Sequence, residues 1–139
     1  MTENESKSLH RRVMSRLRLD VIEGAVNKLT IVDSDLYVRT GWLEGKIVYI
    51  DMSLSHGQED KDKDVFYMSR SWVESSCRQA SRLLQQGVSV EEIISSWMGV
   101  EGYPKGVCYQ LACIVKSPLH AAAVLLEKNI DRWRAEHGA

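Results

Sequence analysis

Hydrophobic and polar residues alternate in three short segments of the first half of the chain. Lys28–Val32 and Leu36–Thr40 flank a polar turn at residues 33–35, whose small acidic and hydroxyl side chains favour a tight reversal. A third alternating segment, Lys46–Met52, follows a turn at residues 43–45 that contains glycine. The pattern predicts an antiparallel meander of three strands.

A long segment with helical spacing follows the meander. We predict a helix that begins near Lys63 or Asp64, runs to Gln86 and stops at Gly87, because glycine tolerates the left-handed backbone of a helix end. The predicted inward stripe of this helix consists of Val65, Met68, Trp72, Ser76, Ala80, Leu83 and Leu84.

Two further helices are marked by capping signals. Ser89 and Glu92 form a capping-box pattern that opens a short helix, and Ser117 followed by Pro118 is typical of an N-cap and first helical residue. The last helix is predicted to extend to about Arg134, and residues 98–105 form a glycine-rich loop. The inward side chains are Ile93, Ile94 and Trp97 in the short helix and Ala121, Val124, Leu125 and Ile130 in the last.

These elements predict an α+β fold in which a small antiparallel meander packs against one long and two further helices. An additional amphipathic helix is expected at Leu9–Leu19, where apolar residues recur on one side and arginines on the other. We therefore divide the chain into a basic helical arm, residues 1–27, and an α+β domain, residues 28–139. The polar segment Ser55–Asp64 is predicted to be a loop.

Composition narrows the class of protein. The chain has 139 residues, of which 44% are hydrophobic, so one core can form without disulfides or metal. The formal net charge of −1 argues against a protein that mainly coats nucleic acid. Since the beginning lacks an apolar signal core and no uncharged run reaches the length of a membrane helix, we expect a cytoplasmic protein with no membrane contact.

The cysteines and histidines suggest no established metal or catalytic motif. Cys108 and Cys113 are spaced C-x4-C, which differs from the C-x2-C of common zinc sites, and with Cys77 they are expected to be reduced thiols that fill apolar space. A metal shell completed by His56 or His120 stays an alternative, as does a nucleophilic pair of Cys113 with His120. We expect no cofactor and no metal.

Arginine and aromatic residues near strand ends and the start of the long helix suggest a ligand site. Arginine can hold a phosphate, an aromatic face can stack on a base, and the first turn of a helix favours an anion. In the alternative interpretation Trp72 belongs to the core, Arg39 pairs with Asp51, and Arg70 is solvated. The candidate ligand-binding residues are Arg39, Thr40, Trp42, Tyr67, Arg70 and Trp72.

The basic arm and the tryptophans suggest contacts with macromolecules. Arginines in the arm could bind along a phosphate backbone. Alternatively they form the solvent-exposed face of a helix docked on a partner subunit, and the flanking acidic residues favour this second interpretation. Exposed tryptophans would suit a homo-oligomer interface, unless each anchors its own element. The residues concerned are Arg11, Arg12, Arg16 and Arg18 in the arm, and the tryptophans Trp42, Trp97 and Trp133.

Several short segments of the sequence resemble the TSCPD domain at the carboxyl end of adenosylcobalamin-dependent ribonucleotide reductases. They are LYVRTG at Leu36–Gly41, the Glu44-Gly45 turn, YIDM at Tyr49–Met52 and LLQQGVSVEEII at Leu83–Ile94. The motif that names the family would fall on residues 115–119, where only the proline, Pro118, is retained. Serine stands at the position of the motif cysteine.

The resemblance implies a stand-alone, non-catalytic binding module related to that reductase domain, since the radical chemistry of the family belongs to another domain and its cofactor. Such a module would bind a nucleotide-type ligand or a protein partner. The first alternative is a phage-type inhibitor that sequesters a host nucleotide signal or blocks a host defence complex. The second is a nucleic-acid-binding accessory protein.

Overall fold

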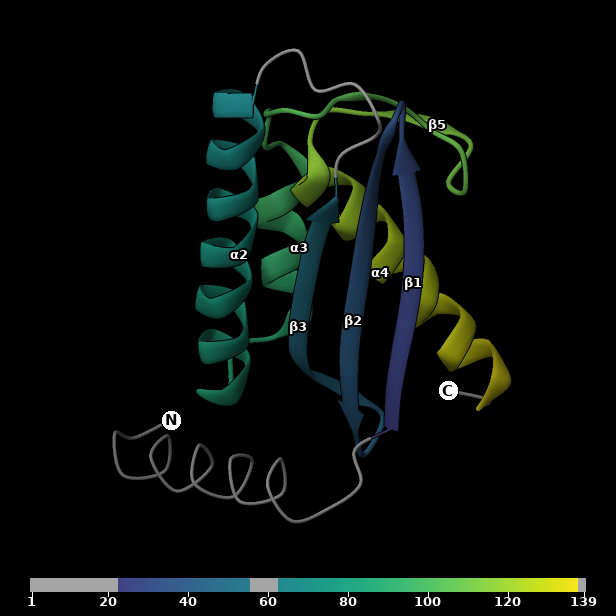
Figure 1. The fold of residues 1–139 in the computed structure, drawn as a ribbon. Coiled ribbons are helices and arrows are strands. Elements are labelled where there is room, and N and C mark those ends of the chain that lie inside the picture. The colour runs from purple at the N-terminus through teal and green to yellow at the C-terminus, as the bar shows by residue number, and fades with distance from the viewer. Residues whose placement is uncertain (1–22, 56–62, 138–139) are drawn as a thin grey trace.

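The computed structural model describes residues 23–55 and 63–137, and in this part of the chain one antiparallel sheet is combined with three helices (Figure 1). The strands are ordered β3-β2-β1-β4-β5. The predicted Leu9–Leu19 helix lies outside the described residues. In chain order the elements are β1 (Glu23–Ile31), β2 (Ser34–Leu43), β3 (Lys46–Ser55), α2 (Lys63–Gln85), α3 (Val90–Met98), β4 (Gly106–Cys108), β5 (Cys113–Val115) and α4 (Pro118–Glu136).

The mixed α/β class is confirmed, but the prediction of three strands was wrong. The meander forms the part β1-β2-β3, and two additional short strands extend the sheet beyond β1. Each has three residues, too few for alternation to be visible in the sequence. The three long strands also begin or end outside the predicted limits, and β1 starts at Glu23 instead of Lys28.

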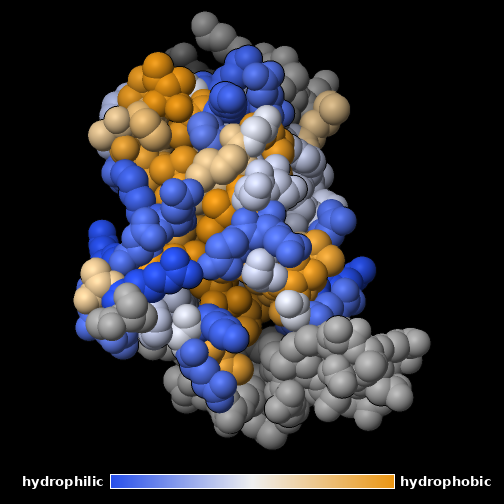
Figure 2. All heavy atoms as spheres, turned by 180° about the vertical axis from the view of Figure 1, so that it is seen from behind, coloured by the Kyte–Doolittle hydropathy of each residue, from blue (hydrophilic) through white to orange (hydrophobic). Residues whose placement is uncertain are grey.

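One face of the sheet carries the hydrophobic core and the other is free of helices (Figure 1). Along β2, Leu36 and Val38 are buried while Tyr37 and Arg39 remain partly exposed, as the two-residue period of a strand requires. On the side of the helices, apolar side chains are visible between charged ones (Figure 2). The buried strand residues of the core are Leu29, Ile31, Leu36, Val38, Ile47, Val48, Ile50, Met52 and Leu54.

The boundaries of α2 match the prediction closely, but its buried stripe is shifted by about one residue. Met68, predicted to face inward, is 72% exposed, whereas its neighbour Ser69 is buried. Two neighbouring stripes of this helix contain apolar residues at helical spacing. The stripe that packs against β3 also contains the buried serines Ser69 and Ser81. The observed stripe is Phe66, Ser69, Val73, Cys77, Ala80, Ser81 and Leu84.

The helix ends follow the predicted capping chemistry. Gly87 has a φ of 97°, in the left-handed region, after the end of α2. Ser89 Oγ accepts a hydrogen bond from the Glu92 backbone N–H at the start of α3. The Ser117 hydroxyl oxygen accepts the backbone N–H of His120, and Pro118 takes the first position of α4. Local sequence therefore determines where these three helices begin or end.

The helix α2 covers the edge of the sheet formed by β3. The buried Ser81 hydroxyl accepts a hydrogen bond from the Ile50 backbone N–H (3.0 Å) and donates one to the Ile50 carbonyl (2.8 Å). One turn earlier, the Cys77 sulfur forms a hydrogen bond with the Met52 backbone. A strand edge without such partners pairs readily with other chains, so α2 occupies the place of a further strand.

We predict that Ser81→Ala destabilises the protein by about 1–3 kcal/mol, because it leaves a buried N–H and a buried C=O of Ile50 without partners. Urea unfolding followed by circular dichroism measures the change. Ser75→Ala, at an exposed position of the same helix, is the matched control and should change the free energy of unfolding by less than about 0.5 kcal/mol. Equal effects of the two substitutions would contradict the role of Ser81.

Candidate functional site

A hollow of about 600 Å³ lies where the turn between β2 and β3, the start of α3 and the second half of α4 meet. This volume is in the range of pockets that bind small molecules. Its walls combine two indole rings, from Trp42 and Trp133, with the charged side chains of Lys46, Glu91 and Arg134. No other hollow described below combines aromatic faces with cations in this way.

The aromatic wall is assembled from both ends of the chain. The rings of Trp42 on β2 and Trp133 on α4 are stacked, with centroids 6.3 Å apart and planes 24° apart. Trp133 also stacks on His137, with ring centroids 4.1 Å apart. The Trp42 Nε1–H donates to the Thr40 hydroxyl (3.1 Å), which orients the ring. Both indoles therefore have defined positions.

Gly45 is part of the reason that Trp133 fits. Its φ of 77° belongs to the left-handed region, and a Cβ atom at this position would lie 2.6 Å from the Trp133 ring. Glycine is thus needed both for the tight turn after β2 and for the close approach of the indole. The turn and the aromatic wall depend on the same residue.

The charged groups of the hollow surround the start of α3. Arg134 Nη2 lies 3.0 Å from Glu91 Oε1, so this guanidinium is shared with a carboxylate. Lys46 is exposed and has no ion pair among residues 23–55 and 63–137. The backbone N–H groups of the first turn of α3 add a partial positive charge. The arrangement can hold a flat aromatic group against indole and an anion beside the lysine.

The predicted site residues on β2 lie on opposite faces of the sheet. Arg39 is on the helix-free face, where its Nη1 is 3.2 Å from Asp51 Oδ2 and 2.8 Å from Ser53 Oγ. Thr40 is buried on the other face and accepts the Trp42 indole N–H. The alternative pairing of Arg39 with Asp51 is therefore the observed one.

Two of the three predicted site residues on α2 make contacts within this helix, and the third packs against a distant loop. Arg70 makes an ion pair with Glu74 in the same helix at 3.4 Å, and the exposed Tyr67 has its ring beside Phe66. Trp72 packs over Gly102, where an added Cβ would lie 2.7 Å from the indole. Of the six candidates, Trp42 alone lines the hollow.

Sequence reasoning did not include Lys46, Glu91, Trp133 and Arg134 in the ligand site, although Trp133 was among the interface candidates. The sequence does contain a glycine in a turn, Gly45, and an aromatic residue near the end of the last helix, Trp133. Their contact cannot be predicted from sequence, because the two residues are distant along the chain. The third interface candidate, Trp97, is buried in the core and serves as an anchor of α3.

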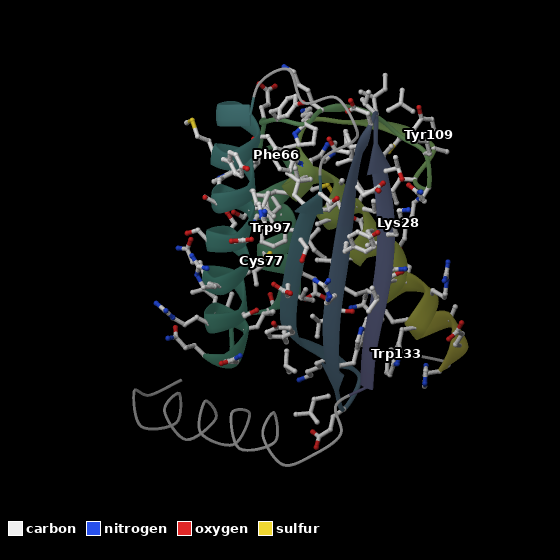
Figure 3. The ribbon with its side chains drawn as sticks, viewed as in Figure 1. Lys28, Phe66, Cys77, Trp97, Tyr109 and Trp133 are labelled. Carbon is white, nitrogen blue, oxygen red and sulfur yellow. The ribbon has the colours of Figure 1, made fainter. Side chains whose placement is uncertain are left out.

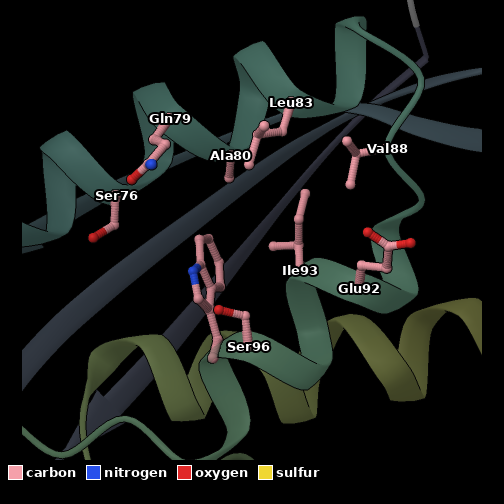
Figure 4. A pocket seen from close by; sticks show the side chains of 9 residues that line it. Ser76, Gln79, Ala80, Leu83, Val88, Glu92, Ile93 and Ser96 are labelled. Carbon is pink, nitrogen blue, oxygen red and sulfur yellow. The ribbon is translucent and has the colours of Figure 1, made fainter.

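Two smaller hollows lie between helices. One of about 300 Å³ separates α2 from α3, and Figure 4 shows Ala80, Leu83 and Ile93 among the side chains that point into it. The other, of about 360 Å³, separates α3 from α4. The former has no cationic side chain in its lining, and the arginine of the latter, Arg134, is shared with the larger hollow.

The cysteines and histidines do not form a metal centre in the described residues. Cys108 and Cys113 face each other across β4 and β5 as free thiols. His120 Nδ1 accepts the Lys116 backbone N–H (2.8 Å), and burial followed by the nearby Lys116 charge lowers the pKa of this imidazole. His120 therefore has a capping role, while His56 and the four arginines of the basic arm lie outside the described residues.

Comparisons with family models, with curated proteins and with solved structures find no match. The residues that the structure describes include no helix with the length and apolar character needed to cross a membrane. The site is therefore interpreted from its own geometry.

We predict that Cys77 makes stability fall at alkaline pH. Burial, and then the charge of Asp51, raise the pKa of this thiol from 9.0 to about 12. The folded protein thus keeps a proton that the unfolded chain loses, so the contribution of Cys77 is complete below pH 9 and is lost as the pH rises toward 12. In urea titrations above pH 9, this thiol should reduce the free energy of unfolding by about 1.4 kcal/mol per pH unit.

Cys77→Ala should flatten this alkaline slope, whatever its effect on stability at neutral pH. Ser75→Ala, which alters an exposed position of the same helix without removing a thiol, is the matched control and should keep the wild-type slope. The pKa values of Tyr49 and Cys108 are also raised, mainly by burial, so a residual slope is expected. Identical slopes in the wild type and Cys77→Ala would refute the prediction.

Proposed function

We propose that the protein is a non-catalytic binding module that takes a nucleotide-type ligand, an aromatic ring bearing phosphate, in the hollow beside Trp42 and Trp133. The observation that carries the proposal is the stacked pair of indoles in the wall of a hollow of about 600 Å³, which is also lined by Lys46, a residue without an ion pair among the described residues. An indole face stacks on a nucleobase without regard to its hydrogen-bonding pattern, and each such contact contributes about 1–3 kcal/mol.

The phosphate end would lie toward Lys46 and the start of α3. Lysine offers a mobile point charge, and the first turn of a helix offers N–H donors together with the positive end of its dipole. Glu91 opposes an anion at this place but is already paired with Arg134. If a phosphate of the ligand replaced the Glu91 carboxylate on Arg134, the guanidinium could form a bidentate contact with that phosphate.

The resemblance to the TSCPD domain supports a binding function over a catalytic one. The residue at the position of the motif cysteine, Ser117, is completely buried, and its hydroxyl oxygen caps α4. A buried serine that caps a helix stabilises the fold and cannot reach a substrate. We therefore propose that the protein is related to the reductase domain and that its activity is recognition of a ligand.

We predict that nucleoside di- or triphosphates, deoxynucleotides or cyclic oligonucleotides raise the melting temperature of the purified full chain. A ligand at about 100 times its dissociation constant adds roughly 2.7 kcal/mol to the free energy of unfolding. Lys46→Gln should weaken the best ligand about tenfold, because it removes one charge-assisted contact. Isothermal titration calorimetry measures this loss.

Arg70→Gln is the matched control, because Arg70 lies on α2 and pairs with Glu74 away from the hollow. It should bind the ligand as the wild type does. If no compound in the panel raises the melting temperature, or if Arg70→Gln weakens binding as much as Lys46→Gln, the proposed pocket is wrong.

A further inference from the structure

The strand β1 is paired along its whole length on one side and on only a short part of the other. Its register with β2 runs from Glu23↔Trp42 to Ile31↔Ser34, whereas its register with β4 consists of the single pair Ile31↔Cys108. Figure 1 shows the lower part of this outer edge without a neighbouring strand. No strand among residues 23–55 and 63–137 therefore occupies the position beside the rest of β1.

The direction of the backbone groups at this edge follows from the two-residue turn after β1. Ile31 and Ser34 close the turn as a hydrogen-bonded pair, and bonded pairs alternate along an antiparallel ladder. The N–H and C=O groups of Thr30 thus point outward. In agreement, the Thr30 N–H donates to Gln110 Oε1 (2.6 Å), and the Thr30 carbonyl accepts the Tyr109 N–H (3.1 Å).

Below Thr30 the outward groups belong to Lys28, Val26 and Gly24. No backbone or side-chain partner from residues 23–55 or 63–137 reaches them. The Val26 side chain is 66% exposed because it lies on the helix-free face, opposite Arg39. Figure 3 shows Lys28 on β1 and Tyr109 on the same side of the sheet. As far as the described residues are concerned, the edge is therefore open from Lys28 to Gly24, and it is closed at its upper end by the turn between β4 and β5.

The floor of the open position is formed by α4. Asn129 Nδ2 donates to Asn27 Oδ1 (3.3 Å), which fixes this helix beneath β1. Ile130 faces α3, so Lys128 and Arg132, on the opposite side of α4, lie toward the outer edge. The proximity of Lys128 to β4 is seen in its influence on the pKa of Cys108. Both cations are exposed and form no ion pair with the described residues.

We propose that the β1 edge, from Gly24 to Lys28, binds an extended segment of a partner protein that carries acidic side chains at alternate positions. The backbone of the segment would complete the ladder with Gly24, Val26 and Lys28, as in other cases of strand addition. Its side chains that point toward α4 would meet Lys128 and Arg132. This surface is distinct from the hollow proposed for a nucleotide-type ligand.

A second copy of the chain suits this edge less well than an isolated strand. Two antiparallel copies of β1 would be related by a two-fold axis perpendicular to the sheet. Figure 1 shows α4 crossing behind β1 and continuing past it, so that axis would bring the α4 helices of both copies close together. An isolated strand brings no second helix to this edge, which favours a flexible segment of a partner.

Selection of random peptides displayed on a surface, with the full chain as bait, tests the proposal. Val26→Pro is the decisive variant, because it removes an outward N–H and no bond of the β1–β2 ladder. Val26→Ala keeps the N–H and is the matched control. Selected peptides should be acidic, and they should bind Val26→Pro at least about tenfold more weakly than Val26→Ala.

Two further measurements apply if Val26→Pro unfolds. The double variant Lys128→Glu and Arg132→Glu should lose the acidic peptides, and hydrogen exchange of the Val26 and Lys28 amides in the wild type should slow when a peptide is bound. Absence of selected peptides, or peptides that ignore all of these substitutions, would overturn the proposal. A wild-type dimer that Val26→Pro dissociates would overturn it as well, because the edge would then belong to a second copy.

Discussion

The backbone hydrogen-bonding capacity of the sheet edges is the constraint on which the other parts of this structure depend. At β3 the constraint is met by α2, through the two hydrogen bonds between Ser81 and Ile50. This contact holds the long helix along the edge and not across the middle of the sheet. Space is thereby left behind β2 and β1 for α3 and α4, which bury the remaining apolar side chains (Figure 1).

At the other edge the same constraint is met only in part. Val107 of β4 accepts the Val32 N–H, Tyr109 and Gln110 in the following turn bond to the backbone of Thr30, and the pairing ends there. The β4–β5 hairpin cannot continue the ladder toward Gly24, because the chain reverses directly after Cys108, in the turn at residues 109–112. The asymmetry between a covered β3 and a half-covered β1 is thus a consequence of strand length.

Local signals in the sequence were sufficient for the helix ends, since Gly87, Ser89 and Ser117 act through contacts within a few residues. They placed the first turn at residues 33–35, whereas it lies at residues 32–33 and Ser34 already belongs to β2. They were not sufficient for the rotation of α2. Met68 and Ser69 are both compatible with a helix, and the choice between them depends on packing against β3, a segment distant in sequence. The more hydrophobic residue lies outside because Ser69 is on the side that contacts the sheet.

The candidate site was the least predictable feature for the same reason. Trp42 was identified from sequence, yet its stacking partner Trp133 is 91 positions further along the chain. The six residues first grouped together share chemical character, but strand alternation places Arg39 and Thr40 on opposite faces, and α2 uses Arg70 in a local ion pair. The chemical type of a residue therefore does not show which residues form one site, because tertiary packing determines the face on which each side chain lies.

Both proposed surfaces depend on one stretch of α4. Asn129 fixes the helix beneath β1, and Trp133, one turn later, forms the aromatic wall with Trp42. The end of β1 at Glu23 is paired with Trp42 itself, so the open edge and the hollow meet at the same end of the sheet. A substitution that moves α4 would therefore disturb both surfaces together, whereas Lys46 and Val26 each belong to one surface only. These two residues, and not those of α4, can separate binding of a small ligand from binding of a partner strand.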